Sequence, residues 1–217
     1  MNMSATGPNY LNTLNNQQKE AVLHTEGPLL ILAGAGSGKT KVLTTRVTHL
    51  IQSKKCFSNQ ILCVTFTNKA ANEMRERVQG LVVGNANSVP WLGTFHSISN
   101  KILRKHAEAV GLKPSFTILD TLDQLKLIKN ILAAENIDIK KNPPKLIAHM
   151  IDHWKNKALT PSEIKASPSD YSKINALKIY RIYQERLKMM NCVDFGDLIL
   201  HCVTIFKNFK EIRESFK

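Results

Sequence analysis

The residue types best suited to chemistry lie in a run of small residues that ends in a lysine and a threonine, AGAGSGKT, at positions 33–40. Its three glycines allow positive φ angles, so that several backbone N–H groups can face one bound anion. Lys39 would place its charge on the β and γ phosphates of a nucleotide, and the Thr40 hydroxyl would bind magnesium. The run predicts a phosphate-binding loop, although Ala33 stands where the strict pattern GxxxxGK[ST] has its first glycine.

A strand and a helix are expected to hold this loop. The apolar run at 28–32 predicts a buried strand, because it is short and is bounded by glycine on both sides. After the loop, apolar residues recur at helical spacing, and the N-terminus of such a helix adds partial positive charge to a phosphate site. The residues on this helical face are Val42, Leu43, Val47, Leu50 and Ile51.

Two further strand-to-helix units follow. ILCVTF at 61–66 leads into the helical TNKAANEMRERVQ, for which Asn68 is the predicted N-cap, and WLGTFHS at 91–97 leads into ISNKILRKHAEAV. Successive units of this kind predict a parallel sheet whose strand ends collect ligands. Aromatic and hydrogen-bonding side chains at those ends suit stacked bases and a phosphate backbone. For Phe66 taken alone, a position in the core is the more common outcome. The residues at the two ends are Phe66, Thr67, Asn68, Thr94, Phe95 and His96.

Composition limits the partners and the compartment. The 217 residues carry 30 Lys and Arg against 17 Asp and Glu, a net charge of +13, which favours a polyanionic partner such as nucleic acid. The four cysteines show no CxxC spacing, so reduced thiols are expected. No signal-peptide pattern and no membrane-length apolar run is present in the sequence, and we therefore expect a soluble cytoplasmic protein.

Several motifs in a fixed order resemble the N-terminal part of the UvrD/Rep/PcrA-type superfamily-one DNA helicases, from about Leu14 to Lys217. LNNQQKEAV resembles the adenine-reading Q motif of that family, and AGAGSGKT its Walker A loop. TFTNKAANEM and GTFHS are similar to its two early DNA-binding motifs, and VDFGDLIL to the short motif that follows its helical insertion.

The resemblance implies an α/β fold of the P-loop NTPase (RecA-like) class, a parallel sheet flanked by helices with an all-helical insertion. Residues 1–100 and 191–217 would form an incomplete first motor domain, which binds ATP, and residues 101–190 the insertion. The implied function is that of an ATP-dependent DNA helicase with 3′→5′ direction, which couples ATP hydrolysis to translocation on single-stranded DNA and to duplex unwinding. Its cofactors would be ATP and Mg²⁺, and its partners single strands and single-strand/duplex junctions.

The resemblance also assigns roles to individual residues. Lys39 and Thr40 would be catalytic, Thr40 would hold magnesium, and Gln18 would contact the adenine. The DNA-binding residues would be the six at the two strand ends. The nucleotide-binding residues would be Gln18, Ala33, Gly34, Ala35, Gly36, Ser37, Gly38, Lys39, Thr40 and Lys41.

The sequence departs from the family pattern at two positions. Lys41 stands where many relatives have arginine near the adenine, and an ammonium lacks the planar face of a guanidinium. Gly196 stands in VDFGDLIL where an acidic residue or alanine is common, which leaves the role of that segment open.

No apolar run in the sequence ends in Asp-Glu, as a Walker B strand does. Asp120 in FTILD has no following glutamate and is predicted to cap a helix. The simplest expectation is a truncated chain that is incomplete for catalysis. A non-catalytic nucleotide- and DNA-binding remnant is the first alternative. A P-loop kinase or other small-molecule enzyme is the second, and it predicts no salt-sensitive binding of single strands.

Overall fold

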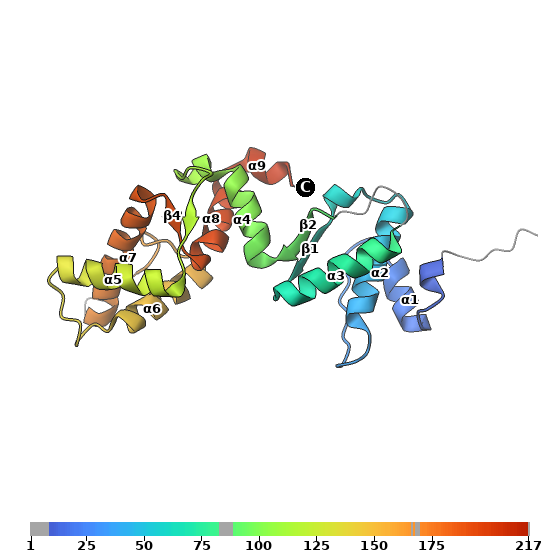
Figure 1. The fold of residues 1–217 in the computed structure, drawn as a ribbon, viewed down its shortest axis with the longest axis horizontal. Coiled ribbons are helices and arrows are strands. Elements are labelled where there is room, and N and C mark those ends of the chain that lie inside the picture. Colours follow the sequence, from blue (N-terminus) through green and yellow to red (C-terminus); the bar gives the residue numbers. More distant parts are fainter. Residues whose placement is uncertain (1–8, 83–88, 166, 168–169, 217) are drawn as a thin grey trace, which may run out of the picture. The chain divides into compact units, whose positions relative to one another are not determined.

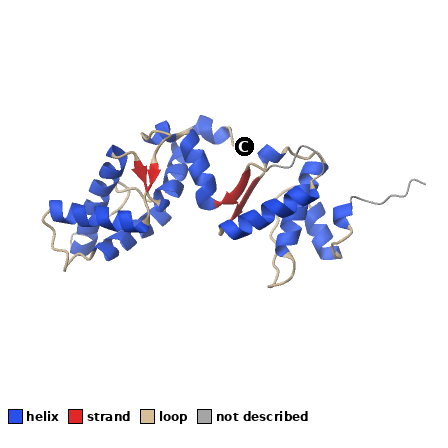
Figure 2. Cartoon of the chain, viewed as in Figure 1, coloured by secondary structure: helices blue, strands red, loops and turns tan. Residues whose placement is uncertain are grey.

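The computed structural model describes residues 9–82, 89–165, 167 and 170–216. The chain divides into two compact units, residues 1–95 and residues 96–217 (Figure 1), and each is described by itself. Helices dominate both units, and each contains one small parallel sheet (Figure 2).

The predicted division into motor domain and insertion stays a prediction. In the structure, residues 191–216 belong to the same compact unit as the predicted insertion. Some of the residues assigned to the predicted domains lie outside the described part of the chain: 1–8, 83–88, 166, 168, 169 and 217.

The described residues of the first unit form three α-helices and a two-stranded parallel sheet. Helix α3 packs against both strands, and α2 packs against α1 and α3. The sheet pairs Leu62 with Trp91 and Thr65 with Thr94, so the two strands end level with one another. The elements are α1 (Asn16–Leu23), α2 (Lys39–Gln52), β1 (Leu62–Thr65), α3 (Asn68–Leu81) and β2 (Trp91–Thr94), with short 3-10 helices at Asn9–Leu11 and Ser58–Gln60.

Most of the predicted pattern in this unit is confirmed. Both strands and the helices that follow them form where the sequence predicts. On α2, Val42 and Val47 are buried as expected, whereas Leu43 is 45% exposed. Buried side chains between the sheet and its helices form the core of the unit, and they include Val47, Ile61, Ala71, Met74, Val78 and Leu92.

The predicted strand at 28–32 is wrong. These residues form no strand in the structure, and Leu30 and Leu32 are 81% and 86% exposed. A strand needs a hydrogen-bonded neighbour, and among the described residues the sheet of this unit consists of β1 and β2 alone. The apolar run therefore leads into the loop without forming a strand.

The second unit has a helical core. Helix α4 starts at the last residue of the first unit, and α5, α6 and α7 pack on one another around buried aliphatic and aromatic side chains. Trp154 stacks on Tyr180 with ring centroids 5.8 Å apart. The elements are α4 (Phe95–Lys105), a 3-10 helix (Ala107–Val110), β3 (Thr117–Ile118), α5 (Thr121–Ala134), α6 (Pro144–Asn156), α7 (Tyr171–Met189), β4 (Cys192–Val193), α8 (Phe195–Asn208) and α9 (Lys210–Glu214).

The predicted insertion at 101–190 is not all-helical. Strand β3 lies within it and pairs in parallel with β4, Ile118 opposite Val193. The Leu119 N–H donates to the Val193 carbonyl at 2.8 Å, which fastens the chain before α5 to the chain before α8. Asp120 then caps α5, as predicted, by accepting from the N–H groups of Leu122 and Asp123.

The helical segment at the C-terminal end of the described chain is interrupted. Phe209 leaves the helical conformation (φ −116°, ψ 89°) and separates α8 from α9. The four cysteines carry free thiols. Within the described part of the chain, no helix combines the length and the apolar character that a membrane crossing requires.

Candidate nucleotide and DNA site

The predicted phosphate loop forms the approach to α2. Gly36 and Gly38 take the left-handed conformation, with φ of 75° and 83°, whereas Gly34 does not, contrary to expectation. The hydroxyl of Ser37 donates to the Gly34 carbonyl at 2.7 Å and closes the turn. Gly38 is the N-cap of α2 and has no side chain to satisfy the first N–H groups of that helix. Such a helix start suits an anion.

Lys39 extends its ammonium into this loop. Its Nζ atom donates to the carbonyls of Ala33 at 2.8 Å and of Gly34 at 2.6 Å. Thr40 is the second residue of α2 and is half-buried. The backbone conformation, the lysine and the uncapped helix start together fit a phosphate group, because each of them favours negative charge at the same place.

Gln18 connects α1 to the loop. It completes a capping box with Asn15, and its Nε2 atom donates to the Ser37 carbonyl at 3.0 Å. A Cβ atom at Gly38 would lie 2.9 Å from the same Nε2. The side chain predicted to read adenine thus braces the loop in this structure, and the adenine contact stays a prediction.

Lys41 points away from the loop carbonyls. Its Nζ atom donates to the Thr13 carbonyl at 2.5 Å. Lys41 also lines a cavity of about 350 Å³, in which Gln18 takes no part. The other lining residues are Tyr10, Thr13, Thr44, Thr45, Arg77, Gly80 and Leu81.

An exposed pair of aromatic rings marks the ends of β1 and β2. Phe66 is 91% exposed, which excludes the alternative that it belongs to the core. Its ring centroid lies 5.6 Å from that of Phe95, because the two residues directly follow the paired Thr65 and Thr94. The parallel register therefore brings together two of the aromatic residues that the sequence singled out.

The polar residues at these ends divide into exposed and buried ones. Thr67 is the N-cap of α3 and accepts from the Ala70 N–H at 3.2 Å, so the prediction of Asn68 as N-cap is wrong by one residue. Thr67 keeps an extended backbone, while Asn68 is already helical and exposed. Thr94 is only 8% exposed and ends β2.

His96 meets an aromatic residue to which the sequence gave no role. The His96 and Phe195 rings meet edge to face, with centroids 6.1 Å apart and planes at 83°. Phe195 is the first residue of α8 and is half exposed. Phe195 could have been singled out in the sequence because it lies between two aspartates that start a helix. No sequence pattern near Phe195, however, showed that His96 lies beside it.

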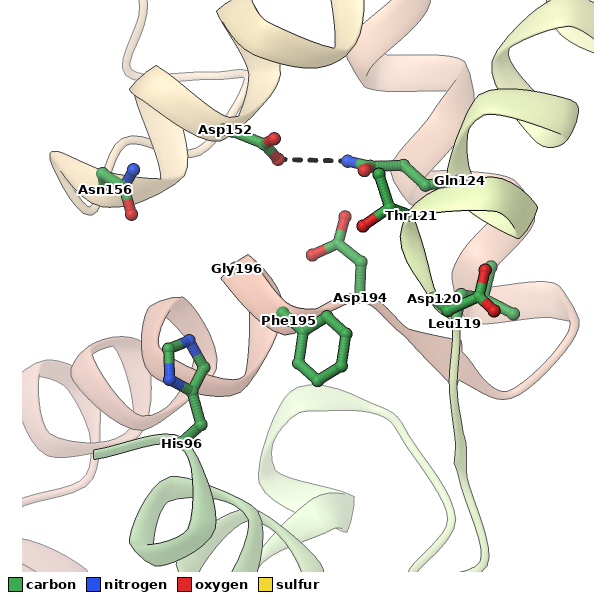
Figure 3. A pocket seen from close by; sticks show the side chains of 10 residues that line it. All are labelled: His96, Leu119, Asp120, Thr121, Gln124, Asp152, Asn156, Asp194, Phe195 and Gly196. Carbon is green, nitrogen blue, oxygen red and sulfur yellow. Dashed lines mark hydrogen bonds between the residues drawn. The ribbon is translucent and has the colours of Figure 1, made fainter. Parts of the chain in front are cut away.

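A hollow of about 210 Å³ lies beside Phe195 (Figure 3). His96 and Phe195 stand on one side of it, and side chains from α5 and α6 on the other. On the side formed by α5 and α6, Gln124 Nε2 donates to Asp152 Oδ1 at 3.0 Å. The remaining lining residues are Leu119, Asp120, Thr121, Asn156, Asp194 and Gly196.

Beneath Phe195 lies a buried ion cluster. The Lys155 ammonium is 2.6 Å from Asp194 Oδ2 and 2.7 Å from Asp197 Oδ1, and all three side chains are buried. Burial and the charge of Asp197 raise the pKa of Asp194. Burial also opposes ionisation of Asp197, but the positive charges of Lys155 and His201 outweigh it and lower the Asp197 pKa.

Comparison with known proteins decides the family. The UvrD/REP helicase N-terminal domain matches residues 14–217. The chain belongs to the UvrD/REP helicase family. Membership implies a P-loop NTPase fold. The structure itself shows a helix-rich mixed α/β chain with small parallel sheets.

Relatives within the UvrD/REP helicase family are DNA helicases by name. The chain is 44% identical to the ATP-dependent DNA helicase PcrA of Staphylococcus aureus over 207 residues, 95% of this chain and 28% of the relative. It is 47% identical to DNA helicase II of Rickettsia typhi over 213 residues, 96% of this chain and 32% of the relative. The chain therefore spans about a third or less of the length of these relatives.

Proposed function

We propose that this chain is the N-terminal portion of an ATP-dependent DNA helicase that couples ATP hydrolysis to 3′→5′ movement on single-stranded DNA and to duplex unwinding. Family membership and 44–47% identity to two such helicases support the class of reaction. The direction rests on resemblance alone. In this proposal the first motor domain is of the RecA-like type and is formed by residues 1–100 and 191–217.

The observation that carries the proposal is the ammonium of Lys39 inside the loop. It is held by two carbonyls beside an uncapped helix start, which is where the β and γ phosphates of ATP would bind. On binding, Lys39 would exchange these carbonyls for phosphate oxygens and offset charge on the transferred group. Gln18 and Lys41 flank the loop, and we retain them as the residues nearest the adenine.

Magnesium fits the same end of α2. The Thr40 hydroxyl lies one residue beyond Lys39 and would supply a hard oxygen ligand. When bound, the ion would neutralise part of the phosphate charge. Both assignments concern the nucleotide and do not depend on DNA.

We propose that each unit contributes its own contact to single-stranded DNA: the ends of β1 and β2 in the first unit, and His96 with the start of α8 in the second. The exposed pair Phe66–Phe95 and the pair His96–Phe195 offer ring faces and edges for bases. Thr67 and Asn68 are exposed beside Phe66, whereas the buried Thr94 would act by holding the end of β2. The net charge of +13 favours the phosphate backbone.

Replacement of Lys39 by alanine tests the nucleotide site. Lys39→Ala should abolish binding of a fluorescent ATP analogue while affinity for a single-stranded oligonucleotide stays within about twofold, because the ammonium is held by carbonyls of the phosphate loop. Lys129→Ala is the matched control, since it removes an equal charge from an exposed position on α5. Unchanged nucleotide affinity in Lys39→Ala would show that the loop does not hold phosphate.

A second candidate function is binding of nucleotide and DNA without turnover. It is favoured by the lack of an apolar run ending in Asp-Glu in this sequence, since such a run supplies the carboxylates that hold magnesium and orient water. ATP turnover by the same protein, with and without single-stranded DNA, separates the two. DNA-stimulated turnover that Lys39→Ala removes excludes the second candidate.

A further inference from the structure

Lys155 is a fully buried lysine on α6, and it lies directly under the start of α8. Its side chain is 0% exposed, and both carboxylates that pair with it come from the first turn of α8 or its cap. Tyr183 of α7 donates its hydroxyl to Asp194 Oδ2 at 2.9 Å, and Gln184 donates to Asp197 Oδ1 at 2.9 Å. Three helices thus meet in one hydrogen-bonded cluster.

The two aspartates enclose Phe195. Asp194 is the N-cap of α8 and accepts from the Asp197 N–H at 2.9 Å, while Asp197 accepts from the Asp194 N–H at 3.1 Å. This reciprocal capping box closes the four-residue segment in which Phe195 lies. Because Lys155 binds both carboxylates of the box, the ammonium fixes the backbone that carries the phenylalanine.

Gly196 shows how closely the lysine approaches this backbone. A Cβ atom there would lie 2.9 Å from Lys155 Cδ and 3.2 Å from Lys155 Cβ. The φ angle of Gly196 is not in the left-handed region, so space and not conformation requires the glycine. Glycine at this position, where the family pattern has another residue, therefore leaves room for the side chain of the buried Lys155.

The hollow beside Phe195 gives the ring an alternative place. It has about 210 Å³ and is lined by Phe195 itself together with Asp194 and Gly196 (Figure 3). A capping box without its cation would keep two buried carboxylates with uncompensated charge, and the start of α8 would move to hydrate them. The ring would then turn from His96 toward the hollow.

We propose that Lys155 is a positioning residue, which holds Phe195 against His96 so that both rings face single-stranded DNA. The inference rests on the proposed function for its DNA contact. The position of the Phe195 ring, however, can be measured without DNA, because the ring current of Phe195 acts on the proton resonances of the neighbouring His96 imidazole.

The first experiment is proton NMR of the full chain in the absence of DNA. Lys155→Met, which keeps the length of the side chain and removes its charge, should shift the His96 ring resonances in the same direction as Phe195→Ala. Lys157→Met removes an equal charge just after α6, at an exposed position, and should leave these resonances in place. Unshifted His96 resonances in Lys155→Met would overturn the positioning role.

The second experiment is a double-mutant cycle read by oligonucleotide affinity. Phe195→Ala should weaken binding about 5- to 150-fold, the range for loss of one stacked base. Lys155→Met should weaken it as well, but adding it to Phe195→Ala should cause no further loss. Losses that multiply in the double variant would show that Lys155 acts on the fold in general, and would overturn the proposal.

Gly196→Ala covers the case in which Lys155→Met does not fold. It keeps every charge of the cluster and displaces Lys155 by contact alone, so it should shift the His96 resonances and weaken binding only when Phe195 is present. Unshifted His96 resonances in folded Gly196→Ala would contradict the inference. A wild-type chain with no oligonucleotide affinity would reject the proposed DNA site, while the NMR result would still decide the position of the ring.

Discussion

Two glycines of the phosphate loop differ in what they require. Gly38 has a φ of 83°, and an added Cβ would lie 2.9 Å from the Gln18 amide nitrogen. At Gly34 an added Cβ would meet nothing within 4 Å, and φ is not left-handed. Both the backbone conformation and the nearby Gln18 side chain therefore favour glycine at position 38. Neither of these factors favours glycine at position 34.

Gly38→Ala should lower the free energy of unfolding by about 1–2 kcal/mol, the usual cost of a side chain in the left-handed region. It should also weaken binding of an ATP analogue, because Gln18 must leave the Ser37 carbonyl and the start of α2 must shift. Urea unfolding and analogue titration measure the two effects. Gly34→Ala is the control for stability, and an equal loss in both variants would contradict this account.

Residue type predicted some of the site and missed the rest for a physical reason. Lys39 and Phe66 could be identified from their neighbours in the sequence, because Lys39 follows a run of glycines and Phe66 follows an apolar strand. Lys155 does not, because a lysine is normally exposed, and its burial depends on carboxylates 39 and 42 positions away. Local patterns cannot show such a partnership.

At the scale of elements, the parallel pairing of β1 and β2 makes one aromatic surface from two separate motifs. Phe66 and Phe95 are 29 residues apart in the sequence but 5.6 Å apart by ring centroid. Because each ring follows the last residue of its strand, any change in the register of the sheet would separate them.

Phe66→Ala should weaken single-strand affinity by about 1–3 kcal/mol if a base stacks on this ring. Phe95→Ala should weaken it too, and the double variant should lose less than the sum, because each ring supports the other. Fluorescence anisotropy with a labelled oligonucleotide gives the affinities. Phe57→Ala removes a phenylalanine that is also largely exposed and serves as control; an equal effect there would argue against stacking.

Elements were predicted well where the sequence fixes both their pattern and their neighbour. β1, β2 and the helices after them follow from apolar runs bounded by turn and capping residues. The run at 28–32 is also apolar, yet it forms no strand because pairing depends on a partner strand as well as on hydrophobicity. The β3–β4 pair was missed for the opposite reason: two residues in each strand give no period to detect.

At the scale of the whole molecule, protonation of histidines should destabilise the second unit. Burial, together with the charges of Lys155 and Lys188, lowers the pKa of His201 below its ordinary 6.5, although Asp197 opposes the shift. Burial and Lys105 lower the pKa of His106 as well. The unfolded chain then binds more protons than the folded chain below pH 6.5, so stability falls as the pH falls through this window.

His201→Gln should reduce this loss. Urea unfolding followed by the fluorescence of the buried Trp154 should show a smaller decline in unfolding free energy, from pH 6.5 downward, in the variant than in the wild type. His153→Gln replaces an exposed histidine on α6 and is the control. Identical pH dependence in wild type and His201→Gln would contradict the assignment.

The exposed leucines of the first unit also affect the solubility of the protein. Leu30, Leu32 and Leu62 are 81%, 86% and 63% exposed, and the described sheet of this unit has only the two strands β1 and β2. At low ionic strength the net charge of +13 makes the molecules repel one another. Added salt screens this repulsion, so that the exposed leucines can associate. The solubility of the protein should therefore fall as the salt concentration rises, which is the opposite of salting-in, and turbidity measurements on concentrated samples would show it.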